Sequence, residues 1–153
     1  MRDYAECKPF LDYLAAEHRR LHQAVLQVEQ GLKEKWRERD RVWVKERLTE
    51  LRRQLQEHFV AEEAGGCLEE AVCRCPTLSP QVAILQHQHA SMLEEIDTVI
   101  ARVDAGTPGV EGVVSHSFTQ LIQRIEEHER AENHVLERAF GSDQGNYDGP
   151  AVS

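Results

Sequence analysis

The sequence predicts an all-α protein, a single four-helix bundle whose helices run up-down-up-down. Three observations predict it. Apolar residues recur at alternating spacings of three and four along four long segments, as the helices of an antiparallel bundle require. Glycine and proline gather between these segments. The 153 residues, 41% hydrophobic and 29% charged, are enough for one domain with a buried core.

Each predicted helix carries one apolar stripe that continues along its length. The first stripe consists of Leu11, Leu14, His18, Leu21, Val25, Val28 and Leu32. The second consists of Val44, Leu48, Leu51, Leu55, His58 and Glu62. The third consists of Val82, Leu85, His89, Met92, Ile96, Val99 and Val103. The fourth consists of Val114, Phe118, Leu121, Ile125, His128, Glu132, Val135 and Ala139.

Local signals predict where the first three helices begin or end. Pro9 suits the first turn of the first helix, and Asp40 suits the N-cap of the second. The Gly65-Gly66 pair is expected to end the second helix. A loop is then expected up to Ser79, which would cap the third helix just before a proline.

The last helix is separated from the third by residues 105–109, which contain two glycines and a proline. From residue 141 onward the chain is rich in glycine and polar residues. The expected organisation is therefore a bundle over residues 1–140 and a flexible C-terminal tail over residues 141–153.

Six polar residues lie on the apolar stripes. There is one histidine on each helix, and a glutamate one turn after the histidine of the second and fourth helices. They are His18, His58, Glu62, His89, His128 and Glu132. A polar side chain in a bundle core is costly unless it is paired or bound. A set this ordered favours a metal site over a buried polar network.

The four histidines are also predicted to lie at one level of the bundle. Each is 14 residues, about 21 Å of helix, from the stripe residue nearest its turn. These 14-residue intervals are His18–Leu32, Val44–His58, His89–Val103 and Val114–His128. Corresponding ligands of the two halves are 70 or 71 residues apart, which predicts two helical hairpins related by a pseudo-twofold axis.

Four imidazoles and two carboxylates suit a pair of divalent or trivalent metal ions. Imidazole binds iron, zinc, copper or nickel, whereas each carboxylate can bridge two ions. Shared carboxylates leave open positions for an oxo or hydroxo bridge and for a small ligand. The stripes lack thiolates beside these ligands, which disfavours a structural zinc site.

These motifs resemble the hemerythrin-like, His-His-Glu cation-binding domain family over roughly residues 10–140. The matching motifs are Glu17-His18, His58-x-x-x-Glu62-Glu63, Gln88-His89 and His128-x-x-x-Glu132-Asn133. The resemblance implies a hemerythrin-like four-helix bundle with a non-heme centre of two Fe ions. By this analogy His18 and His58 serve one iron, His89 and His128 serve the other, and Glu62 and Glu132 bridge them.

The chain departs from the oxygen-carrying members of this family. They have a fifth histidine one turn before the third-helix ligand, where this chain has Leu85. His22 is a replacement ligand or, in preference, an outer neighbour of the site. The remaining histidines are expected at the surface or beside the site: His87, His116 and His134. Several residues that flank ligands are expected either to hydrogen-bond the imidazoles or to be solvated: Glu17, Glu57, Glu63, Gln88 and Glu127.

The resemblance therefore implies a protein that handles oxygen, nitric oxide or redox and iron stress, as a sensor or repair factor. Two alternatives stay open: a reversible oxygen-binding carrier, which Leu85 disfavours, and a peroxide-decomposing di-iron enzyme. Whether the chain is an enzyme is left undecided. The expected partners are a small diatomic ligand or peroxide and an unidentified redox protein.

Charge and cysteine content bear on the remaining partners. A net charge of −9 argues against nucleic acid and anionic membranes. The start of the chain has no apolar signal core, which predicts a cytoplasmic protein with reduced thiols. Cys73 and Cys75, near Cys67, are ordinary thiols, a redox pair or a soft-metal site.

Overall fold

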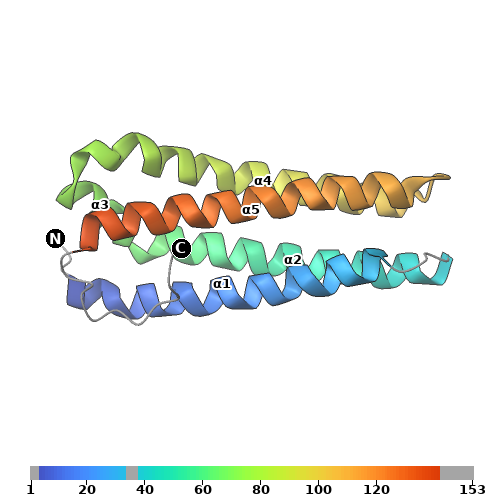
Figure 1. Ribbon diagram of the computed structural model, residues 1–153, viewed down its shortest axis with the longest axis horizontal. Helices are drawn as coiled ribbons and strands as arrows, with labels where there is room; N and C mark the ends of the chain where they lie inside the picture. Colours follow the sequence, from blue (N-terminus) through green and yellow to red (C-terminus); the bar gives the residue numbers. More distant parts are fainter. Residues whose placement is uncertain (1–3, 34–37, 142–153) are drawn as a thin grey trace.

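The computed structural model describes residues 4–33 and 38–141, and over these ranges the chain is helical with no strand (Figure 1). The helices are α1 (Tyr4–Lys33), α2 (Glu38–Gly65), α3 (Cys67–Arg74), α4 (Ser79–Ala105) and α5 (Val110–Phe140). A short 3-10 turn, η1 (Pro76–Leu78), precedes α4. The predicted all-α class is confirmed.

The four long helices lie side by side, and each runs opposite to the one before it (Figure 1). Helix α1 packs on α2, α2 on α4, α4 on α5 and α5 on α1, so the four enclose a common core. The short α3 lies at one end and packs mainly against α5. None of the described helices has an apolar stretch that would cross a bilayer.

Two apolar clusters divide the core along the helix axes. The larger one extends toward the α1–α2 and α4–α5 turns and includes Leu21, Leu55 and Ile125. The smaller one lies toward α3 and includes Leu14 and Leu85. On α1, α4 and α5 the histidine of the stripe lies between residues of the two clusters, and on α2 His58 and Glu62 follow Leu55 of the larger cluster. The six polar stripe residues therefore form a layer between two apolar blocks.

Helix α3 occupies residues for which the sequence predicts a loop. Gly66 separates it from α2 with φ 73°, a left-handed conformation that glycine adopts without steric cost. The buried residues of α3 include Cys67, Leu68 and Ala71, which pack into the smaller apolar cluster. The loop prediction is wrong because eight residues are too few for helical periodicity to be recognised.

The predicted helix starts are also displaced. Helix α1 extends back to Tyr4, so Pro9 lies inside it, beyond its first turn. Asp40 lies inside α2. Ser79 is already helical, and Leu78 is the N-cap without a side-chain hydrogen bond. Capping signals are local, and packing of the long helices extends them past these residues.

Cys7 and Cys67 form a disulfide that joins α1 to α3, with 5.8 Å between their Cα atoms. Both side chains are fully buried in the smaller apolar cluster. The prediction of reduced thiols is therefore wrong for this pair, whose members are 60 residues apart in sequence. Cys73 and Cys75 are free thiols, the first of them exposed.

The predicted tail, residues 141–153, lies outside the described residues except for Gly141. The division into a bundle over 1–140 and a tail therefore stays a prediction.

Candidate metal centre

The six polar stripe residues come together in the layer between the apolar clusters. They form two groups of four, within each of which the ligand atoms lie within 4.8 Å of one another. The first group is His18, His58, Glu62 and Glu132, and the second is Glu62, His89, His128 and Glu132. The structure thus brings every sequence-predicted site residue into one cluster that could hold a metal ion.

Glu62 lies between the two histidine pairs. Its Oε1 contacts Nε2 of His58 on the same helix, and its Oε2 lies 3.0 Å from Nε2 of His89 on α4. The glutamate is only 1% exposed. One carboxylate therefore directs a different oxygen to each group.

Glu132 has the same relation to the other two histidines. Its Oε1 lies 3.3 Å from Nε2 of His18 on α1, and its Oε2 lies 3.7 Å from Nε2 of His128. The residue is fully buried. The two glutamates therefore span the same pair of groups from opposite hairpins.

Many of these converging atoms have no hydrogen-bond partner among the described residues, although they lie close together. They are Nε2 of His18, His58 and His128, Oε1 of Glu62, and both carboxylate oxygens of Glu132. Buried polar atoms are normally satisfied, and leaving several unsatisfied in one place is costly. A set of lone-pair donors aimed at one space fits a metal cation, so the residues present suit such a site.

The pKa values of the two glutamates are shifted in opposite directions. Burial would raise the pKa of Glu62, but contacts with His128, His58 and His89 outweigh it and hold that pKa well below its usual range. Burial and the charge of Glu62 raise the pKa of Glu132 well above its usual range. The metal-free layer therefore holds a proton on Glu132 more readily than on Glu62.

The pKa values of His18 and His89 are also shifted in opposite directions. Burial, together with the neighbouring His58, lowers the pKa of His18 to about 4. Burial would lower the pKa of His89 too, but hydrogen bonds to Glu62 and Glu63 outweigh it and raise that pKa. At neutral pH the His18 imidazole is thus already in the neutral form that binds metal, whereas protons compete more strongly with a metal ion for the His89 imidazole.

Metal binding is expected to release protons, and the number released per chain is expected to rise as the pH falls from about 8 to about 6. The pKa of Glu132 and the pKa of His89 are both raised, so each side chain holds its proton to a higher pH than usual, and a metal ion must displace that proton. Calorimetric titration of the metal-free protein with Zn²⁺, in two buffers of different ionisation enthalpy, measures this number. A count of zero throughout the range would contradict the assignment.

Three further residues support the second group. Glu63 Oε1 lies 3.0 Å from Nδ1 of His89, and Gln88 Oε1 lies 2.8 Å from Nδ1 of His128. Phe59 stacks on the His89 ring with 4.2 Å between centroids and 7° between planes. The sequence indicated Glu63 and Gln88 as neighbours of ligands, whereas Phe59 was missed. The sequence signal that could have identified Phe59 is its place directly after His58, on the buried side of α2.

The other histidines are not part of the cluster. His87, His116 and His134 are exposed, as predicted. His22 is exposed as well and lines a cavity of about 20 Å³ together with Glu126 and Glu129, which is room for about one water molecule. His22 therefore lies beside the cluster without joining either group of ligands.

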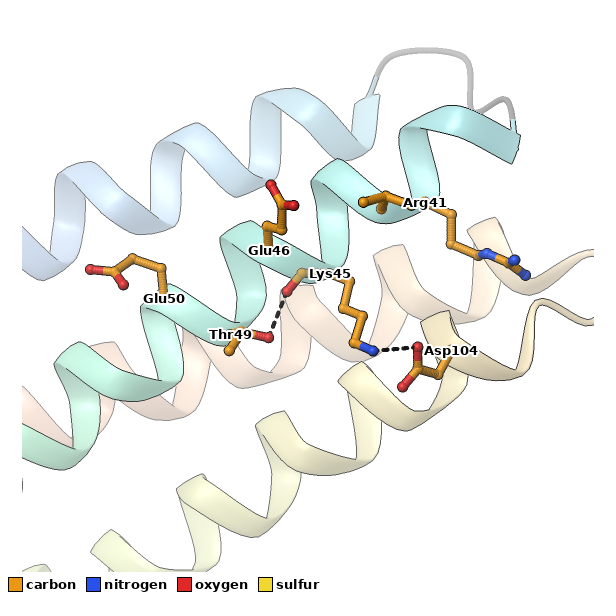
Figure 2. A pocket seen from close by; sticks show the side chains of 7 residues that line it. Arg41, Lys45, Glu46, Thr49, Glu50 and Asp104 are labelled. Carbon is orange, nitrogen blue, oxygen red and sulfur yellow. Dashed lines mark hydrogen bonds and ion pairs between the residues drawn. The ribbon is translucent and has the colours of Figure 1, made fainter.

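A larger groove, of about 500 Å³, lies along the first half of α2 and is lined by charged side chains of both signs (Figure 2). Lys45 crosses it to Asp104 on α4, with 2.7 Å between Nζ and Oδ1. Lys45 precedes His58 by 13 residues, about 20 Å of helix. The groove is therefore separate from the metal-ligand cluster, and its ion pair joins two helices.

Comparison of the chain with protein-family models, curated proteins and solved structures found no match. The chemistry of the six clustered residues is therefore the indicator of what this chain does.

Proposed function

We propose that this chain is a hemerythrin-like di-iron protein, built as an up-down-up-down four-helix bundle. The observation that carries the proposal is the position of Glu62 and Glu132. Each is buried between the two histidine pairs and directs one oxygen to each pair. A bridging carboxylate requires this arrangement, whereas a single-ion site requires only one of the groups.

In this proposal His18 and His58 hold one iron, His89 and His128 hold the other, and Glu62 and Glu132 bridge them. Imidazole and carboxylate ligands suit iron, and an iron pair supplies redox chemistry with open positions for a small molecule. The apolar clusters on both sides of the layer limit access of water to it. The chain's own contribution is to bury, orient and keep apart the two sets of ligands.

Leu85 bears on which small-molecule function the site serves. It is 1% exposed and belongs to the apolar cluster of Leu14 and Val135, one turn before His89. A buried aliphatic side chain there cannot ligate. We therefore favour a protein that handles oxygen, nitric oxide or redox and iron stress over a reversible oxygen carrier.

The proposal is tested by metal analysis and visible spectroscopy of the purified protein. We expect two iron ions per chain, and absorption changes when the reduced protein meets oxygen or nitric oxide. Zinc alone, or no metal after incubation with Fe²⁺ under anaerobic conditions, would overturn the proposal. A fully reversible oxygen spectrum would instead favour the carrier, and iron-dependent peroxide turnover would favour the enzyme.

A further inference from the structure

The internal repeat provides a comparison between the two halves of the ligand layer. With offsets of 70 and 71 residues, His18 corresponds to His89 and His58 corresponds to His128. The same offsets pair Glu17 with Gln88, and Asn133 with Glu63. In a fully symmetric layer, Glu17 would support His58 and Asn133 would support His18.

The two supporting contacts of the second group are present. Nδ1 of His89 has the carboxylate of Glu63 as its partner, and Nδ1 of His128 has the amide oxygen of Gln88. A partner at Nδ1 fixes the tautomer, so that Nε2 carries the lone pair toward the metal, and it also orients the ring. A carboxylate partner further raises the basicity of its imidazole.

The corresponding contacts of the first group are not made. Glu17 lies 3.0 Å from Arg20 on its own helix, and Nδ1 of His58 is buried without a hydrogen-bond partner among the described residues. Asn133 is one methylene shorter than Glu63 and, within the described part of the chain, makes no hydrogen bond to His18. The repeat is thus broken at both supporting positions of the same group.

The solvent exposure of the histidine side chains also differs between the first and the second group of ligands. The His18 side chain is 12% exposed, compared with 4% for His89 and 2% for His128. An ion at the first group therefore has one ligand that reaches solvent, whereas an ion at the second group has none that does so to this extent.

We propose that the two metal positions are unequal, so that the position of His89 and His128 binds its ion first and the position of His18 and His58 holds the exchangeable ion. This inference rests on the proposed metal centre. Outer hydrogen-bond partners of this kind are worth about 10- to 100-fold in metal affinity. The exchangeable position is then the one from which the ion is lost first.

The test is a titration of the metal-free protein with Co²⁺, followed by visible absorption and calorimetry. Two binding steps are expected, separated by at least about 10-fold in dissociation constant. Glu63→Ala and Gln88→Ala are each expected to weaken the tighter step by about 10- to 100-fold and to leave the weaker step in place. His18→Ala is expected to remove the weaker step alone.

Two variants at the corresponding positions are the matched controls. Asn133→Glu restores the missing support for His18 and is expected to strengthen the weaker step by about 10-fold. Glu17→Ala is expected to change neither step. Circular dichroism of each metal-free variant checks that the helices are intact.

Two equal steps, or a His18→Ala variant that loses the tighter step, would overturn the inference. A weaker step that Glu17→Ala weakens further would overturn it as well, because Glu17 would then support His58. Absence of any Co²⁺ binding is a separate result, since it would overturn the metal centre and the inference with it.

Discussion

Replacing Glu132 with glutamine is expected to remove nearly all bound metal while leaving the metal-free helices at least as stable as before. Glu132 belongs to both groups of ligands, so its loss weakens both positions together. We expect affinity to fall by more than about 100-fold, because outer partners alone are worth about 10- to 100-fold. Elemental analysis of the purified variant measures the effect.

The stability of this variant separates loss of a ligand from loss of the fold. In the metal-free protein, burial and the charge of Glu62 raise the pKa of Glu132, so the ionised side chain is unfavourable there. A neutral amide of nearly the same volume removes that cost, and the melting temperature of the metal-free form is expected to stay the same or rise.

Two variants serve as references for Glu132→Gln. Glu127→Gln changes the same charge on an exposed position of α5 and is expected to retain all metal. His18→Ala alters only one group and is expected to retain about half the metal. Full metal content in Glu132→Gln, at metal concentrations that just saturate the unmodified protein, would show that the carboxylate is not shared.

Replacing Cys7 with alanine is expected to destabilise the oxidised protein by about 4 kcal/mol. The disulfide closes a loop of 60 residues, and its loss returns that loop's conformational entropy to the unfolded chain. Alanine is chosen because Cys7 is fully buried, where a serine hydroxyl would add a cost of its own. The melting temperature is expected to fall by about 10 °C in a chain of this size.

The control for this variant is Cys73→Ser, which alters an exposed free thiol and is expected to shift stability by less than about 0.5 kcal/mol. Reductant is expected to bring the unmodified protein close to Cys7→Ala, and to leave Cys7→Ala itself unchanged. If reductant leaves the melting temperature of the unmodified protein unchanged as well, the bond does not contribute to stability in solution.

The packing of the long helices could be predicted because it depends on a repeating pattern. Stripe residues such as Leu48, Ile96 and Phe118 are buried as expected. A stripe that recurs every three or four residues can be buried only by packing on similar stripes, whatever the details of the turns. Local features were less predictable. Residues 67–74 form a helix instead of the predicted loop, because the break in the chain at Gly66 and the burial of Cys67 depend on contacts with other helices.

The disulfide shows the same limit for covalent structure. Cys7 lies four residues before Leu11, at the spacing that continues the first stripe by one turn, so its burial could be read from that spacing. The disulfide partner of Cys7 could not be predicted from the sequence, because four cysteines allow several pairings. Only the position of α3 brings Cys67 within reach of Cys7.

The sequence alone determined which six residues meet in the core, since the stripes and equal distances from the turns place His18, His58, Glu62, His89, His128 and Glu132 at one level. Only the tertiary structure decided how these residues differ. Burial sets the opposite pKa shifts of Glu62 and Glu132. The folded arrangement pairs Glu63 with His89, whereas Asn133 makes no hydrogen bond to His18 within the described part of the chain. The physical reason is that periodicity specifies a face and a height, whereas hydrogen bonds and desolvation depend on atoms of neighbouring helices.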